Sequence, residues 1–165
     1  MAQDSLWQRL FNAVKERMQT IRIVNGYETE IGTKCFAWRD LTRTPFTEAE
    51  LQENVGAIVV RDPSRRTEQG KVINTHDHTL TIEVLAVRFA TSSSPPDNYA
   101  RKMLSDIDQA IGVDRLWTVD GVPLARDTVA LEDTIDAVHA GDRLIAVRKT
   151  FNIIFRTQRF DPYNQ

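Results

Sequence analysis

The sequence predicts an α+β fold, in which two long helices pack on one face of a mostly antiparallel mixed sheet. Two observations lead to this class. Apolar residues recur at helical spacing in two segments, one at the N-terminus and one near residue 100. Elsewhere apolar and polar residues alternate over lengths typical of strands, with turn residues between them. The expected element order is α-β-α-β-β-α-β-β, which fits helices layered on a sheet.

The composition is that of one soluble domain. The 165 residues suit a single domain, and 41% apolar with 27% charged residues is ordinary for a globular protein. Cys35 is the only cysteine, which excludes an internal disulfide and a cysteine-rich zinc site and fits a reducing compartment. The N-terminus lacks the features of a signal peptide, and no apolar run approaches the ~20 residues that span a bilayer. We expect one cytoplasmic-type domain over residues 1–165.

The first predicted helix runs from about Asp4 to Gln19. Ser5 and Gln8 have the spacing of a capping box, in which the serine caps the helix and the glutamine reaches back to it. The apolar positions that follow have helical spacing and are expected to face the core: Trp7, Leu10, Phe11, Val14 and Met18.

A strand is predicted after the turn at Asn25-Gly26, in the segment ETEIGTKCFAW. Ile31 and Cys35 would share one face of this strand, and Cys35 is expected to be a small buried apolar residue rather than a nucleophile. Gly32 marks a bulge or a close approach of the backbone.

The middle of the chain is predicted to hold a short helix, two strands and a loop. A second capping box predicts a helix over about 48–54, and the run GAIVVRD after it is typical of a buried strand. An exposed loop is expected at 62–74, and the polar segment RDPSRRTEQGK at its start can also be the tip of a hairpin. Strand character resumes within it and continues to residue 89, and its apolar half, 80–89, is expected to be a central strand.

The last third combines a helix with a β-hairpin. Pro95-Pro96 suits a first helical turn, and Gly112 a position just after the helix. The apolar stripe between them consists of Tyr99, Met103, Leu104, Ile107, Ala110 and Ile111. Two stretches of strand composition then flank a turn at 140–142. The apolar positions that alternate in the second stretch are Ile145, Val147, Phe151, Ile153 and Phe155. Residues 158–165 are expected to form a tail.

Two histidines two residues apart raise the question of a metal site. On an extended chain His76 and His78 project to the same face, whereas Asp77 points the other way. Zinc needs at least three protein ligands, and nothing local brings the remaining histidine, His139, near them. We therefore expect no metal, and histidines that lie on a polar turn or an exposed strand end. A small metal-dependent hydrolase that uses both histidines is the alternative.

The other carboxylates and nucleophiles lack a catalytic pattern. The segment LEDTID does not have the spacing of a calcium loop. Asp106 and Asp108 lie about 200° apart on a helix, so they cannot share a proton or an ion. Both are expected to be solvated, and the alternative is that one of them faces the edge of the core. The glycine-rich phosphate and dinucleotide motifs and the G-x-S-x-G motif are absent from the sequence. We expect no enzymatic activity and no cofactor.

The charge is nearly balanced overall but divided along the chain. A net charge of −2 argues against general nucleic-acid binding. Residues 127–142 contain acids without bases, and residues 143–159 contain bases without acids. The acids are Asp127, Glu132, Asp133, Asp136 and Asp142, and the bases are Arg143, Arg148, Lys149, Arg156 and Arg159. These blocks can pair across a hairpin of one subunit or between two copies, and the sequence leaves both open.

Two short signatures accompany the element order. In VNGYETEIGTKCF a Gly-Tyr turn leads into a Thr-x-Ile-Gly strand, and FNIIFRTQRFDPY is a strand that ends in an aromatic-Arg-Thr and a short tail. Over nearly the whole chain, this combination resembles the tail terminator (tail completion) proteins of long-tailed bacteriophages. The resemblance implies a hexameric ring that caps the tail tube, stops its polymerisation and presents a surface to the neck. It implies no catalysis.

The resemblance also implies partners and a place. The partners are other copies of the chain, the tail tube protein and a neck or head-completion protein. No membrane and no sequence-specific nucleic acid are involved, although DNA passes through the ring lumen. The protein would sit at the head-proximal end of the tail in a virion assembled in the host cytoplasm. Another neck or head-completion adaptor of similar size is the alternative within phage assembly.

Residue roles follow by position. The resemblance implies that a structural motif shapes the first strand: Gly26, Tyr27, Thr29, Ile31 and Gly32. Arg156 and Thr157 would close the last strand. Contacts with neighbouring subunits and the tube would fall on the loop, the tail and the charge blocks. The candidate interface residues are Arg61, Arg65, Arg66, Lys71, Glu132, Asp133, Asp136, Arg148, Lys149 and Arg156.

Overall fold

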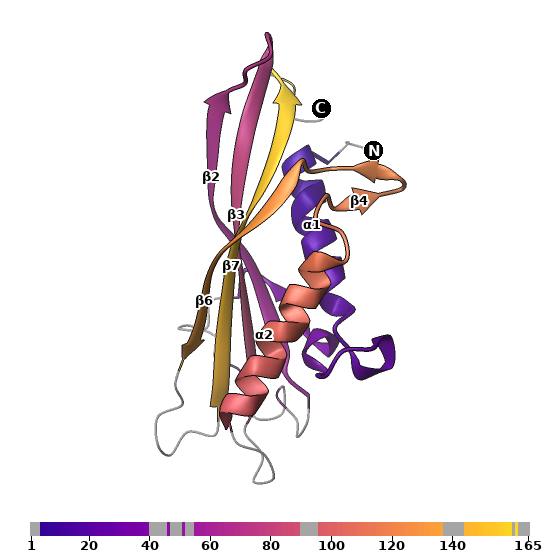
Figure 1. Ribbon diagram of the computed structural model, residues 1–165, viewed down its shortest axis with the longest axis vertical. Helices are drawn as coiled ribbons and strands as arrows, with labels where there is room; N and C mark the ends of the chain where they lie inside the picture. The colour runs from indigo at the N-terminus through magenta and orange to yellow at the C-terminus, as the bar shows by residue number, and fades with distance from the viewer. Residues whose placement is uncertain are drawn as a thin grey trace.

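Five strands form one twisted sheet, and two helices cover one of its faces (Figure 1). The structure is a computed structural model that describes residues 4–39, 46, 51, 55–89, 96–136, 144–159 and 161. The strands lie in the order β1-β2-β3-β7-β6, and all neighbours are antiparallel except β1 and β2. Their bounds are β1 Cys35–Ala37, β2 Ala57–Gln69, β3 Thr75–Phe89, β6 Asp127–Asp136 and β7 Leu144–Gln158. The predicted α+β class is confirmed.

The helices begin where the sequence indicates. In α1 (Leu6–Gln19) the N-cap Ser5 accepts a hydrogen bond from the backbone N–H of Gln8 at 3.3 Å. The side chain of Gln8 donates to Asn12 instead of reaching back, so only half of the expected capping box forms. The second helix, α2 (Pro96–Gly112), starts on a proline as expected. Gly112 was expected just after this helix but is its last residue.

The main core lies between the helices and the sheet face that they cover, called here the inner face. The buried residues of α1 and α2 form one cluster with inner-face residues of β2, β3 and β7. On β7 the predicted alternation is confirmed, since the buried positions include Ile145, Val147, Phe151, Ile153 and Phe155. β3 lies at the centre of the sheet, as expected from the apolar stretch 80–89.

A smaller apolar cluster covers part of the opposite, outer face. Leu51 packs there against Val59, Leu85 and Val87, with Phe36 and Phe46 at its edge. Apart from Leu51, the helix expected over 48–54 lies outside the described residues, as do the turn at 140–142 and most of the tail at 158–165.

The strand expected between residues 28 and 38 is mostly absent. Two 3₁₀ turns, Ile23–Asn25 and Ile31–Thr33, precede β1, which has only three residues. Tertiary hydrogen bonds direct this path, since the N–H of Gly32 donates to the carbonyl of Ile21 at 2.9 Å. A Cβ on Gly32 would lie 2.4 Å from the carbonyl oxygen of Met18, so the predicted close approach is confirmed.

The structural motif implied by the resemblance therefore packs the core instead of shaping a strand. Tyr27, Thr29 and Ile31 are buried, and Gly26 ends the first 3₁₀ turn at φ 88°. The carboxylate of Asp106 on α2 accepts hydrogen bonds from the N–H of Glu28 at 3.0 Å and from the hydroxyl of Thr29 at 2.6 Å. With 1% of its surface exposed, Asp106 is buried, and the expectation that it is solvated is wrong.

The loop expected at 62–74 is mostly strand. β2 continues to Gln69 and β3 begins at Thr75, so only 70–74 form the turn. Together with the end of β7 they make a three-stranded arm (62–81 and 152–158) that extends beyond the helix layer (Figure 1). The segment is exposed, as expected. The strand in this segment was not predicted because the residues of β2 after Val60 are mostly polar on both faces, so no apolar alternation marks them.

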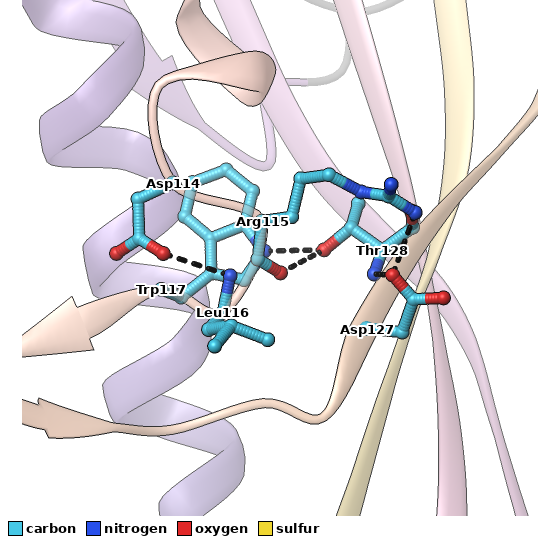
Figure 2. A network of polar contacts seen from close by, with 6 residues as sticks. All are labelled: Asp114, Arg115, Leu116, Trp117, Asp127 and Thr128. Carbon is cyan, nitrogen blue, oxygen red and sulfur yellow. Dashed lines mark hydrogen bonds and ion pairs between the residues drawn. The ribbon is translucent and has the colours of Figure 1, made fainter.

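A small hairpin, which the sequence did not predict, joins α2 to β6. It consists of β4 (Thr118–Val119) and β5 (Val122–Pro123). Figure 2 shows how its base is fixed: the indole N–H of Trp117 donates to the hydroxyl of Thr128 at 2.8 Å. The same hydroxyl donates to the carbonyl of Arg115 at 2.7 Å. Arg115 also pairs with Asp127 at 2.6 Å, so α2 and β6 are tied together here.

No helix among the described residues is long and apolar enough to cross a membrane.

Candidate functional site

The arm carries charged side chains on its outer face. Asp77 accepts two hydrogen bonds from Arg156, at 2.6 and 2.8 Å, and Arg126 lies 3.8 Å away. The hydrogen bond from Arg156 is the main reason that the pKa of Asp77 lies below its ordinary value. Arg66 pairs with Glu68 at 2.9 Å on the same face and is 80% exposed. Asp77 points away from the histidines, as expected for an extended chain.

Below the arm, two predicted interface residues share one carboxylate. Arg61 and Arg148 reach Glu83 of the central strand from either side, at 3.2 and 3.7 Å. Both ion pairs are within the subunit. The cations expected on a loop are thus distributed over a strand surface, and Arg61 already has a partner.

The two charge blocks meet across the β6–β7 hairpin. Lys149 is 4% exposed and its ammonium lies 2.7 Å from Asp133 and 2.6 Å from Asp108 of α2. Burial lowers the pKa of Lys149, but the hydrogen bonds that its ammonium donates to both carboxylates outweigh this effect and hold the pKa above its usual value. For Asp133 and Lys149 the structure therefore shows pairing within one hairpin. Asp136 ends β6 opposite Ala146.

Glu132 differs from its neighbours in β6. It is exposed, lies opposite Thr150 on the outer face, and makes no ion pair with any residue that the structure describes. Around it, Val129 and Leu131 are 41% and 53% exposed. β6 thus presents an acidic and apolar strand at the edge of the sheet.

The tip of the arm is apolar. Val72 and Ile73, in the turn between β2 and β3, are 54% and 88% exposed. Lys71 lies beside them and is exposed as well. Apolar side chains at the end of a projecting hairpin are typical of a surface that another molecule covers.

The two histidines lie on the inner face of the arm, as expected from their spacing. His78 is 7% exposed, and its ring hydrogen-bonds with Thr67 of β2 at 2.9 Å and with Thr157 of β7 at 2.8 Å. It also stacks on Phe155, with 4.8 Å between ring centroids. The expectation of an exposed position is therefore wrong for His78, which joins three strands of the arm.

The hollow beside the histidines is small. It measures about 170 Å³, below the ~300–1,000 Å³ of ordinary small-molecule sites. In its wall the guanidinium of Arg65 stacks over Trp7 of α1 at 4.6 Å. The described part of the chain contains no group of three or more histidine, cysteine or acidic residues placed to hold a metal ion, and His139 lies outside it.

The base of the arm is joined to the body through Asp62. Its carboxylate accepts hydrogen bonds from the indole N–H groups of Trp7 in α1, at 2.7 Å, and of Trp38 after β1. This contact could not be predicted from the sequence, because the three residues are far apart in the chain.

Cys35 packs against the main core, and its thiol lies 3.8 Å from the carbonyl of Lys15. Burial raises the pKa of the thiol to about 11, against a small opposing effect of Lys15, so the reactive thiolate is disfavoured.

Acid is expected to destabilise the arm through His78. Burial, with help from the positive charges of Arg65 and His76, lowers the pKa of His78 from its ordinary 6.5. A base whose pKa is lowered by folding gives stability that is present above pH 6.5 and is lost as the pH falls through the folded-state pKa. Urea unfolding at pH 7.5 and at pH 5 should show this loss in the native chain and a smaller one in His78→Gln. His76→Gln, on the same face, is the control, and equal losses in both variants would contradict the assignment.

No protein-family model matches the chain, and no curated protein matches it in sequence.

Proposed function

We propose that this chain is a structural virion subunit that forms a hexameric ring, caps the tail tube of a long-tailed bacteriophage and offers a surface for head or neck attachment. The observation that carries the proposal is the projecting arm, whose apolar tip, Val72 and Ile73, is exposed on the isolated subunit. Such a tip is expected to be buried by a neighbouring subunit or by the tube.

Two further features support an assembly role. The ion pairs of the charge blocks that the structure describes hold the subunit itself together, which leaves the arm tip and the β6 edge as surfaces for assembly. The two long helices and the strands β2, β3, β6 and β7 follow one another in the expected order, although the first of the two signatures forms turns.

Electron microscopy tests the proposal directly. The major tail protein of the same phage would be polymerised in the presence and absence of this chain. We expect shorter tubes with a ring at one end, and rings of the purified chain at high concentration. A chain that stays monomeric and leaves tube length unchanged would rule the proposal out. Rings that bind a head connector instead of tubes would favour a neck adaptor.

The double variant Val72→Asp/Ile73→Asp is expected to fold normally and to lose capping. Exposed substitutions usually change the free energy of unfolding by less than about 0.5 kcal/mol. Two carboxylates cannot be buried at an interface without a large cost in solvation. Thermal unfolding and tube-length measurements check the two halves of this prediction. Val113→Asp, at a valine 66% exposed beyond α2, is the matched control and should cap normally.

A further inference from the structure

Among the residues that the structure describes, the sheet has two strand edges with which no other strand pairs, one on each side. β6 is the outermost strand on one side. On the other side β1 pairs only with Ile58–Val60 of β2. Beyond them no strand of the described chain pairs with the outer edge of β2. Unpaired edges of this kind are templates for pairing with another chain.

The directions of these edges are compatible. β2, β3, β7 and β6 are successively antiparallel, so β2 and β6 run in opposite directions within one subunit (Figure 1). If two copies stand side by side in the same orientation, β2 of one copy and β6 of the next are antiparallel. They can then exchange backbone hydrogen bonds like any pair in the sheet.

The charges of the edges are complementary. The open stretch of β2 carries Arg65 on the inner face, stacked over Trp7, and Arg66 and Glu68 on the outer face. Arg66 pairs with Glu68 at 2.9 Å, but its side chain is 80% exposed, so it can also reach a carboxylate on a neighbouring strand. On β6 Glu132 lies on the same outer face without an ion pair among the described residues. Opposite charges on neighbouring strands stabilise the pair, and like charges destabilise it.

The bulges set the length of the contact. Pairing of β2 shifts between Arg61 and Ser64, around Pro63, which has no N–H to donate. This leaves 65–69 for a partner strand. These residues lie level with 153–157 of β7, whereas β6 lies level with 146–154. Neighbouring copies must therefore be staggered along the strands, as tilted strands are in a closed barrel.

We propose that residues 65–69 of β2 pair with β6 of a second copy, so that the sheet continues from subunit to subunit. The contact is heterologous, and it closes into a ring when the rotation between copies is a fraction of a full turn. This inference deepens the proposed function and rests on it for the nature of the assembly.

Charge reversal tests the contact. Arg66→Glu and Glu132→Arg should each raise the dissociation constant of self-association about threefold to tenfold, measured by light scattering over a concentration series. The combined variant should return to within about threefold of the native chain. Arg101→Glu, on the exposed face of α2, is the control and should have no effect. The proposal would be overturned if the single variants associated as tightly as the native chain. It would also be overturned if the losses of affinity of the two single variants simply added in the combined variant.

Hydrogen exchange separates backbone pairing from a contact of side chains alone. On assembly, amides in 65–69 and 127–136 should exchange at least about tenfold more slowly, while those of α2 stay unchanged. Rings that cap tubes without this protection would leave the proposed function standing and remove the sheet pairing. Slower exchange at both edges in a protein that does not cap tubes would support the sheet pairing and remove the proposed function. A chain that is monomeric under all conditions removes both.

Discussion

Replacing Trp117 with alanine is expected to lower the free energy of unfolding by about 3–5 kcal/mol, the range for a large aromatic in a core. Trp117 is fully buried, and its ring stacks near Phe151 of β7 with 6.2 Å between centroids. The guanidinium of Arg17 in α1 lies 5.4 Å from the same ring. One side chain thus contacts a helix and the sheet, and its loss leaves a cavity between them.

Urea unfolding followed by circular dichroism measures this effect. Trp117→Phe should keep most of the packing and lose mainly the hydrogen bond to Thr128, which costs about 1 kcal/mol. Val113→Ala is the control, because Val113 is 66% exposed and its truncation leaves no core cavity. A Trp117→Ala variant within about 1 kcal/mol of the native chain would contradict the role assigned to this residue.

Replacing Asp106 with alanine is expected to cost about 2–4 kcal/mol. Its buried carboxylate receives hydrogen bonds from Glu28 and Thr29, and hydrogen bonds to charged groups contribute about 1.5–3 kcal/mol each. The change leaves the N–H of Glu28 and the hydroxyl of Thr29 without this acceptor. The segment that these bonds hold in place also contributes Tyr27 and Ile31 to the core around α1. Asp106→Asn keeps one acceptor oxygen and should lose less.

Thermal unfolding of Asp106→Ala beside Asp97→Ala checks this prediction. Asp97 is on the same helix, and its ion pair with Arg101 is exposed and long, at 3.9 Å, so its loss should matter by less than about 0.5 kcal/mol. Similar melting temperatures for the two variants would show that the buried carboxylate is dispensable.

Sequence periodicity predicted the elements whose pattern is local. The stripe of α1, the start of α2 and the alternation in β7 each follow from residues within one segment, and the structure confirms them. Sequence periodicity gave wrong predictions where contacts between residues far apart in the chain determine the local structure. Thr29 lies between the two 3₁₀ turns and not in a strand, because its hydroxyl donates a hydrogen bond to Asp106, which is 77 residues away in the sequence. The polar stretch 62–69 is a strand because β3 pairs with it, and no apolar pattern records that pairing.

The sequence indicated which charged residues the candidate surfaces contain, but not which of these residues contact one another. The sequence indicated opposite charges around the last hairpin, and the structure pairs Lys149 with Asp133 there. It gave no sign that Asp108 would join them, or that Glu132 would stand apart, because both depend on the packing of α2 and on a bulge in β6.

The bridge from Thr67 through His78 to Thr157 has a mechanical consequence. A free two-stranded hairpin bends and twists. Here a third strand is paired with the hairpin, and the imidazole of His78 links all three strands through its two hydrogen bonds. We therefore expect the arm to bend less than a free hairpin and to hold its tip in place relative to the helices. A partner that binds the tip meets a preorganised surface, and little conformational entropy is lost on binding.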